Sequence, residues 1–267
     1  MKEIFVRALS GSVYAFAIIG SLLYNEIIFY SILLLFVGLA VFEFEKLTNN
    51  KSFFSYIFLI IIWGSFIQLD TTFKYYLKFL LVPALLSHVL LILWLYSKFD
   101  ITKNKIVKNL LSFFYIILSG FFIIYMTEFN NKYNPYILIL LYTLTWVNNT
   151  FAYIIGTLFG KNLIFKSISP KKSWEGLIGG IVFCVSTFYI MIYLNFPIEK
   201  NLILAITICV PILNLYGDLI QSKFKRLAKV KNSGTIIPGH GGFYDRMDSI
   251  LFTAPWIYLI QLINYVS

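Results

Sequence analysis

Long apolar stretches recur along the whole chain and are separated by short polar segments. Hydrophobic residues fill 59% of its 267 positions and charged residues only 13%. A soluble domain of this length has no core large enough to bury so much apolar surface, whereas a bilayer core of about 30 Å accepts helices of roughly 20 apolar residues. The chain is therefore predicted to be an all-α polytopic membrane protein. About nine transmembrane helices are expected, near residues 5–24, 27–43, 52–69, 76–96, 109–127, 135–158, 175–195, 201–220 and 249–266.

The distribution of Lys and Arg predicts how these spans are oriented. If the N-terminus is cytoplasmic, eighteen of the 22 basic residues lie in cytoplasmic segments. The other four are Lys74, Lys78, Lys132 and Lys200. Because cytoplasmic loops carry an excess of Lys and Arg, this bias predicts an N-in/C-out topology, with loops 159–174 and 221–248 both facing the cytoplasm. The net charge of +10 then indicates contact with anionic lipid head groups rather than nucleic acid.

The segment from 218 to 248 collects a large share of the chain's charge between two apolar runs. It holds three carboxylates and six cations: Asp218, Asp245 and Asp248, with Lys223, Lys225, Arg226, Lys229, Lys231 and Arg246. If the eighth helix continues past its apolar run, Asp218, Ser222, Lys225 and Lys229 share one face. The glycine-rich turn at 238–242 would end that helix before the ninth begins. Ionisable residues at a membrane span indicate a functional site.

Carboxylates at this position are typical of a magnesium site. Mg²⁺ takes one or two carboxylates from the protein and completes its shell with water and substrate phosphates. We expect Asp218 and Asp245 to hold the ion. Asp248 would be either a third ligand or a residue that contacts the ligands without binding the ion. A second cation is compatible with this arrangement. The competing interpretation is a salt-bridged basic loop with no catalytic role.

The loop before the seventh span contains a second polar cluster. The Ser169–Pro170 pair predicts the start of a short helix, with the Lys171–Lys172 pair in its first turn. Cations are unfavourable at a helix N-terminus unless an anion binds there, so this placement indicates a phosphate site. Glycines within 176–180 predict a close helix contact. Two roles for Glu175 are equally compatible with the sequence: an ion pair with a nearby lysine, or binding of metal or substrate.

Several polar residues lie within or at the ends of predicted spans. Asn148 and Asn149 in the sixth span favour the lining of a wet cavity over simple interhelical hydrogen bonds. His88 is interpreted as a core or interfacial polar residue. Glu43 and Glu45 are expected at a solvated helix end, although Glu43 could instead face the cavity.

These motifs closely resemble the signature of the phosphatidate cytidylyltransferases, the CDP-diacylglycerol synthases. The resemblance rests on Ser222-x-Phe224-Lys225-Arg226, Lys231, Gly234, Pro238, His240-Gly241-Gly242, Asp245-Arg246-x-Asp248, and on Ser169 to Gly176 with Gly179-Gly180. It covers roughly residues 140–255. The chain would then be a single membrane domain, with N-terminal transmembrane helices in 1–130 and catalytic helices and loops in 131–267. Asn149 and Asn232 stand where the family commonly has Asp, which implies weaker metal binding if either position normally helps to hold the ion.

The resemblance implies the reaction CTP + phosphatidate → CDP-diacylglycerol + pyrophosphate, with Mg²⁺, at a cytoplasm-facing polar cavity of the C-terminal half. In a bacterial cell this would be the inner membrane. The implied catalytic residues are Asp218, Asp245, Asp248, Lys225, Arg226, His240 and Arg246. The implied substrate-binding residues are Ser222, Lys231, Lys171, Lys172, Ser173, Gly241, Gly242 and Asn149. We expect His240 to orient a phosphate rather than to accept a proton.

Other functions are compatible with the same motifs. A polyprenol kinase or an ether-lipid cytidylyltransferase would use CTP on a different lipid, and a transporter or a degenerate non-catalytic scaffold would use no such chemistry. Cytidine retained on the lipid distinguishes a cytidylyltransferase from a kinase. The sequence leaves the oligomeric state open, with a homodimer as one alternative.

Overall fold

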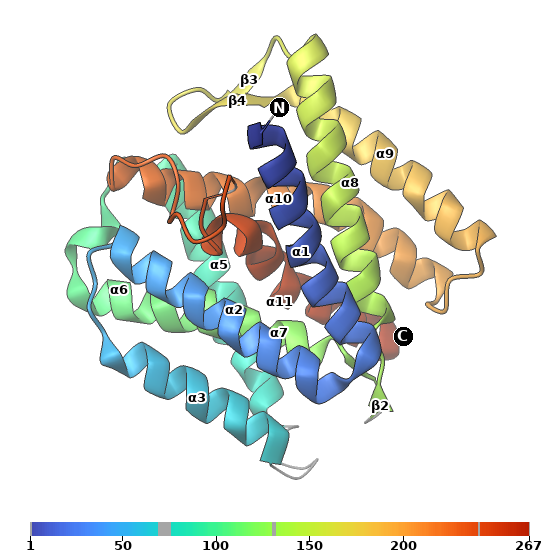
Figure 1. Cartoon of the computed structure of the whole chain (residues 1–267), viewed down its shortest axis with the longest axis horizontal. Coiled ribbons are helices and arrows are strands. Elements are labelled where there is room, and N and C mark those ends of the chain that lie inside the picture. The colour runs from blue at the N-terminus through green and yellow to red at the C-terminus, as the bar shows by residue number, and fades with distance from the viewer. Residues whose placement is uncertain (1, 69–75, 130–131, 240, 267) are drawn as a thin grey trace.

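Helices dominate the computed structural model, which describes residues 2–68, 76–129, 132–239 and 241–266 (Figure 1). The longer helices are α1 (Lys2–Tyr24), α2 (Glu26–Leu47), α3 (Phe53–Gln68), α5 (Leu81–Tyr96), α8 (Tyr136–Phe159), α9 (Trp174–Tyr193), α10 (Lys200–Leu227) and α11 (Tyr244–Val266). The shorter ones are η1 (Lys78–Leu80), η2 (Ile101–Lys103), α6 (Lys105–Leu111), the π-helical η3 (Ser112–Ile117) and α7 (Leu118–Tyr125). Two antiparallel hairpins pair β1 (Glu128–Phe129) with β2 (Lys132–Tyr133), and β3 (Leu163–Phe165) with β4 (Ser169–Ser173).

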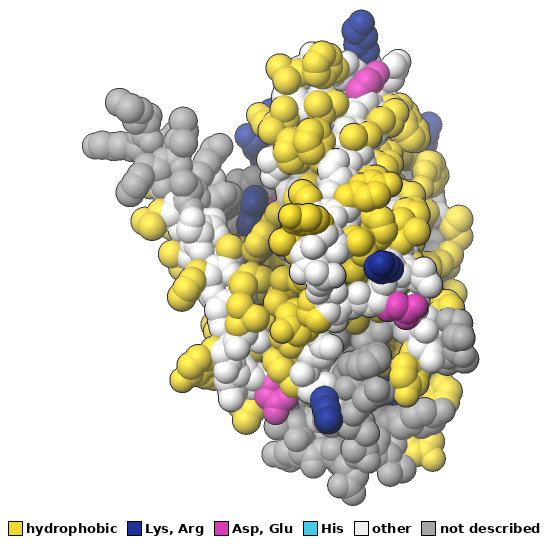
Figure 2. All heavy atoms as spheres, turned by 90° about the vertical axis from the view of Figure 1, so that its right-hand side faces the viewer, with side chains coloured by type: hydrophobic (Ala, Val, Ile, Leu, Met, Phe, Trp, Pro, Cys, Tyr) yellow, Lys and Arg dark blue, Asp and Glu magenta, His cyan; other side chains and the backbone are white. Residues whose placement is uncertain are grey.

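The helices are long and apolar enough for a membrane protein. In the described residues, six stretches meet the length and hydropathy needed to cross a bilayer: Glu26–Leu47, Lys78–Tyr96, Lys105–Tyr125, Tyr136–Phe159, Trp174–Tyr193 and Lys200–Leu227. The other three predicted spans coincide with α1, α3 and α11. Figure 2 shows hydrophobic side chains spread over an outer face that carries few charged ones. Phe16 and Tyr193 are 79% and 85% exposed, which suits contact with lipid rather than water.

Small residues bring α8 and α9 together, and the two helices lie side by side in Figure 1. A Cβ atom at Gly176 would lie 2.7 Å from the carbonyl oxygen of Ala152, and one at Gly179 would lie 2.6 Å from Ile155. Only glycine permits this approach, so the predicted small-residue contact of the seventh span is confirmed. The polar side of α8 is thereby placed next to the start of α9.

Helix α10 carries the charged face that the sequence predicted. Its 28 residues extend about 42 Å at 1.5 Å per residue, which exceeds the thickness of the bilayer core. It packs along α11, where a Cβ atom at Gly217 would lie 2.9 Å from the carbonyl oxygen of Asp248. The helix ends at Leu227, and Lys229 follows with φ of 56°. Lys229 therefore does not continue the helical face of Asp218, contrary to the prediction.

The prediction of a short helix beginning at Ser169 is wrong. Residues Ser169–Ser173 form β4, whose backbone pairs with β3, a long-range constraint that local capping signals do not contain. The residue before a proline also favours extended backbone. The helix cap is Ser173, whose hydroxyl oxygen accepts a hydrogen bond from Gly176 N at 3.2 Å, and α9 begins at Trp174. The Lys171–Lys172 pair consequently lies on a strand.

Two acidic residues of α2 that were expected in solvent are buried. Glu43 and Glu45 are 1% and 5% exposed. Glu45 accepts hydrogen bonds from Ser55 Oγ at 2.6 Å and from Ser52 N at 3.4 Å, which ties α2 to the start of α3. The prediction failed because hydropathy along one helix does not show which polar groups of other elements will pack against it.

Buried nitrogen groups join helices within the core. His88 on α5 is fully buried and stacks on Phe252 of α11, with 4.4 Å between ring centroids, which confirms it as a core residue. Lys223 of α10 is also buried, and its ammonium group donates to the carbonyl oxygens of Trp94 at 2.5 Å and Ser97 at 2.7 Å. Lys223 therefore caps the C-terminal end of α5 and does not belong to the phosphate-binding cations.

Candidate active site

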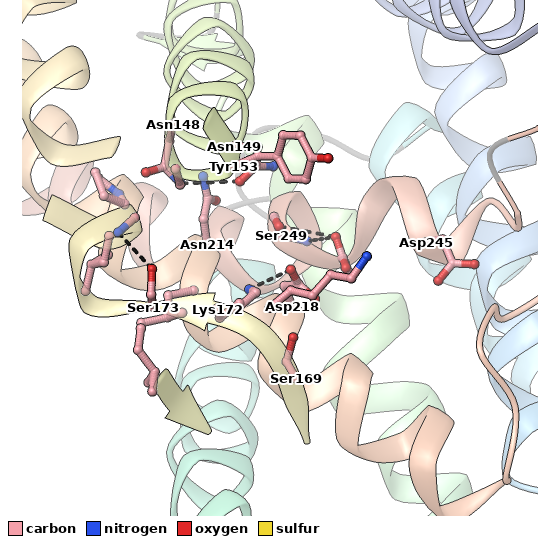
Figure 3. A pocket seen from close by; sticks show the side chains of 18 of the residues that line it. Asn148, Asn149, Tyr153, Ser169, Lys172, Ser173, Asn214, Asp218, Asp245 and Ser249 are labelled. Carbon is pink, nitrogen blue, oxygen red and sulfur yellow. Dashed lines mark hydrogen bonds and ion pairs between the residues drawn. The ribbon is translucent and has the colours of Figure 1, made fainter. Parts of the chain in front are cut away.

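A polar cavity of about 370 Å³ lies between α8, α9, α10, α11 and the β3–β4 hairpin (Figure 3). Its polar lining consists of Asn148, Asn149 and Tyr153 from α8, Ser169, Lys171, Lys172 and Ser173 from β4, Asn214 and Asp218 from α10, and Asp245, Arg246, Asp248 and Ser249 from α11. The predicted cavity of the C-terminal half is therefore present. It unites the two charged loops, which are separated by a complete helical hairpin in the sequence.

Asp218 is bound by a cation from one side and a hydroxyl group from the other. Lys172 Nζ lies 2.5 Å from Asp218 Oδ2, and Ser222 Oγ donates to Asp218 Oδ1 at 3.1 Å. Figure 3 shows Lys172 and Asp218 pointing toward one another from β4 and α10. Their side chains are 23% and 39% exposed, so solutes that enter the cavity can reach this ion pair.

Asp248 adds a second carboxylate to the cavity lining, close enough to Asp218 to interact with it electrostatically. It accepts hydrogen bonds from Ser249 N at 2.6 Å and from Ser249 Oγ at 3.2 Å. Asp248 precedes the apolar stretch of α11, and burial together with the negative charge of Asp218 raises its pKa to about 7. Because the two carboxylates oppose each other's ionisation, a shared cation would stabilise the doubly ionised pair.

Asp245 stands apart from Asp218 and Lys172 in Figure 3, and both its oxygens accept hydrogen bonds. Oδ1 accepts from Lys225 Nζ at 2.8 Å and from Gln221 Nε2 at 3.1 Å. Oδ2 accepts from Ser233 N at 2.8 Å and from Gly242 N at 3.1 Å. Burial alone would raise the pKa of Asp245, but the Lys225 ammonium and the two N–H groups hold it below its usual range. Asp245 is therefore ionised, and it joins α10, α11 and the loop between them.

The donor set suits Mg²⁺ better than a metal held by protein ligands alone. Across residues 2–68, 76–129, 132–239 and 241–266, no three His, Cys, Asp or Glu side chains are grouped closely enough to hold a metal together. Asp218 and Asp248 nevertheless interact electrostatically within one cavity. Mg²⁺ often binds through one or two carboxylates, with water and phosphate oxygens as the remaining ligands. The residues present therefore fit this ion when phosphate groups share the cavity.

Amide side chains line the part of the cavity formed by the membrane helices. Asn148 Nδ2 donates to Asn149 Oδ1 at 3.3 Å. Asn214 joins three helices, because its Nδ2 donates to Thr145 Oγ1 at 3.3 Å and its Oδ1 accepts from Thr253 Oγ1 at 3.1 Å. Asn148 Oδ1 is buried and accepts no hydrogen bond from a described residue. The prediction that Asn148 and Asn149 line a cavity is confirmed.

The structure separates the predicted cations by location. The cations Lys171 and Arg246 line the cavity, as does Ser173, another residue with an implied substrate-binding role. Lys225 contacts Asp245 and is not part of the lining. Arg226 and Lys231 also lie outside it, and Arg226 Nε donates to Ile168 O at 3.1 Å, which supports the turn of the β3–β4 hairpin. His240 lies outside the described residues.

The glycine-rich turn is packed against Glu43, which was expected at a solvated helix end or facing the cavity but lies in neither place. Glu43 accepts hydrogen bonds from the backbone N–H groups of Phe243 and Tyr244. Gly241 has φ of 93°, which favours glycine, and Gly242 N donates to Asp245 rather than to the cavity. The turn thus positions side chains, and the N–H group of Gly242, an implied substrate-binding residue, binds Asp245 instead. The available sequence signal for Glu43 was an acidic residue at the end of an apolar run, followed closely by Glu45.

Comparison with known proteins places the chain among enzymes that use cytidine nucleotides. Residues 5–263 match the model of a family described as the cytidylyltransferase family. The phosphatidate cytidylyltransferase of Staphylococcus saprophyticus is 34% identical over 215 residues, which is 70% of this chain and 82% of that protein. The phosphatidate cytidylyltransferase of Staphylococcus haemolyticus is 34% identical over 217 residues, with the same coverage. The enzyme of that name from Staphylococcus aureus strain COL is 36% identical over 123 residues, 45% of this chain and 47% of its own.

Proposed function

Because the chain belongs to the cytidylyltransferase family, we propose that it converts CTP and phosphatidate into CDP-diacylglycerol and pyrophosphate, a step of phospholipid synthesis. Its relatives carry the name of that activity. The structural observation that carries the proposal is the cavity, which combines carboxylates and cations with the amides of membrane helices α8 and α10. Such a site suits a soluble polyphosphate and a lipid phosphate at the same time.

The proposed reaction brings two anions together. A phosphate oxygen of phosphatidate attacks the α-phosphorus of CTP, the bond to the bridging oxygen breaks, and pyrophosphate leaves. The second pKa of a phosphate monoester is about 6, so this nucleophile is largely dianionic near neutral pH and needs no strong general base. The obstacle is charge repulsion, which Lys171, Lys172 and Arg246 can reduce because they line the same cavity.

Asp218 and Asp248 are the residues proposed to hold magnesium, and Asp245 remains a third candidate in the lining. A bound Mg²⁺ would supply positive charge to the phosphate oxygens. Asp245 differs from the other two because Lys225 already neutralises it and two backbone N–H groups occupy Oδ2. Its proposed role is therefore to fix the loop beside the cavity, with metal contact as a secondary one.

The proposed topology is nine crossings with an N-in/C-out orientation and the cavity facing the cytoplasm, where CTP is found. It is supported by helices at all nine predicted spans and by the bias of Lys and Arg. The acyl chains of phosphatidate would stay in lipid, since transfer to water costs about 0.8 kcal/mol per CH₂. A Lys231→Cys variant tests the orientation: an impermeant thiol reagent should label it only from the cytoplasmic side, and labelling from the outside would contradict the topology.

Purified protein in lipid vesicles tests the proposed reaction directly. With CTP, phosphatidate and Mg²⁺, we expect pyrophosphate and CDP-diacylglycerol in equal amounts, with the cytidine of labelled CTP retained on the lipid. Omission of Mg²⁺ should stop both products, and a parallel preparation from cells that do not express the protein controls for contaminating enzymes. Release of CDP with a newly phosphorylated lipid would indicate a kinase instead. Absence of any product from folded wild-type protein would reject the proposal.

A further inference from the structure

We infer that Glu43, on α2 of the N-terminal half, is a positioning residue that sets the place of Asp245 in the active site. Its carboxylate is 1% exposed and lies against the loop that joins α10 to α11. It does not line the cavity, so it would act through that loop rather than on substrate. The kinetic part of this inference rests on the proposed function, whereas its structural part does not.

Glu43 binds both ends of the loop. Its Oε2 accepts a hydrogen bond from Ser233 Oγ at 2.7 Å, close to the loop's start. At the loop's end, Oε2 also accepts from Tyr244 N at 2.9 Å, and Oε1 accepts from Phe243 N at 3.1 Å. These two N–H groups belong to the beginning of α11, where a carboxylate is favoured by the helix dipole.

The same loop residues bind Asp245. Ser233 donates its backbone N–H to Asp245 Oδ2 at 2.8 Å and its hydroxyl to Glu43. Gly242 donates its N–H to Asp245 Oδ2 at 3.1 Å, and the next two N–H groups go to Glu43. Five donors of one loop are thus divided between two carboxylates, so displacement of Glu43 would displace the partners of Asp245.

Two glycines show that the loop is shaped around Glu43. A Cβ atom at Gly234 or at Gly242 would overlap the Glu43 carboxylate. A larger residue at either position would therefore move the loop or the carboxylate. Gly234 and Gly242 are explained by this close packing, which requires a side chain from a helix about 190 residues earlier in the chain.

Glu45 provides a matched control. It is also a buried carboxylate of α2, 5% exposed, but its partners Ser52 and Ser55 belong to the start of α3. Hydrogen–deuterium exchange of Glu43→Gln should show amides of the described residues in 233–244 exchanging at least about tenfold faster than in wild type, because hydrogen bonds to the buried carboxyl group are lost. Glu45→Gln should leave that segment unchanged. Unchanged exchange in Glu43→Gln would overturn the inference even if phosphatidate were not the substrate.

Kinetics then separate positioning from simple stabilisation. We expect Glu43→Gln to lower kcat by about 10- to 100-fold per folded molecule, as expected for loss of a charged hydrogen bond. Ser233→Ala removes only the hydroxyl contact and should lower kcat less. Because both act through one contact, the double variant should lose less than the product of the two single losses. Wild-type kcat in folded Glu43→Gln, or fully multiplicative losses, would overturn the inference. If Glu43→Gln does not fold, wild-type amide exchange and wild-type kcat in Ser233→Ala would overturn the inference.

Discussion

Replacing Asp245 with Asn should separate the stability of the active site from its activity. Asp245 and Lys225 form an ion pair of 2.8 Å, with side chains only 8% and 12% exposed. Asn has nearly the same shape but no charge, and its NH₂ group would face the donors that now bind Oδ1 or Oδ2. The substitution therefore leaves the Lys225 ammonium buried without its counter-ion.

The expected cost follows from this burial. Removal of one partner of a fully buried ion pair costs about 3–5 kcal/mol, so a slightly exposed pair should lose about 2–4 kcal/mol of unfolding free energy. Removal of both charges avoids most of this cost, since neither is left unpaired. The double variant Lys225→Met/Asp245→Asn should accordingly melt near the wild-type temperature. If the pair also orders the catalytic loop, kcat/KM should fall about 30- to 1,000-fold in both variants.

Two measurements on each purified variant decide the matter: thermal unfolding in detergent and transfer of cytidine to phosphatidate. The single variant should be both less stable and less active, and the double variant should recover stability alone. Recovery of activity in the double variant would show that Asp245 serves only to neutralise the charge of Lys225. Wild-type activity in the single variant would refute its place in the active site altogether.

Three other substitutions test separate parts of the site. Asp218→Asn should raise the Mg²⁺ concentration for half-maximal activity at least about tenfold, measured by titration of the rate, and an unchanged requirement would remove Asp218 from the metal site. Gly241→Ala places a Cβ atom 2.7 Å from Asp245 Oδ2 at a φ of 93°, so it should cost about 1–3 kcal/mol of stability with loss of turnover, whereas Gly64→Ala, with no atom within 4 Å, should be tolerated in both assays. Lys171→Met should raise the KM for CTP about tenfold, and Lys231→Met, outside the cavity, should not; equal effects would contradict the placement of the two lysines.

Helix positions were predictable because they depend on local properties. Span length and hydropathy are set by the bilayer, so the predicted stretches coincide with helices, six of which in the described residues are long and apolar enough to cross it. The presence of Asp218, Asp245 and Asp248 in one polar cavity was also predictable, since a charge beside an apolar run is costly unless it has a function. These signals are contained in short windows of sequence, which need no knowledge of the partners.

The failed predictions depend on contacts between distant segments. Ser169 had the local pattern of a helix cap, but pairing with β3 made it part of a strand. Arg226 belonged to a cationic cluster in sequence, yet it supports the backbone at Ile168. Glu43 was taken for a solvated residue because its partners lie about 190 residues further along the chain. In each case a partner outside the local window decided the role.

The buried ammonium group of Lys223 limits how the chain can be divided. Its acceptors are the carbonyl oxygens of Trp94, Leu95 and Ser97, which belong to the end of α5. A fragment limited to residues 131–267 would retain this cation but lose all three acceptors, and a buried ammonium group without acceptors is unfavourable. Split or truncated forms of the enzyme should therefore require co-expression of the missing half.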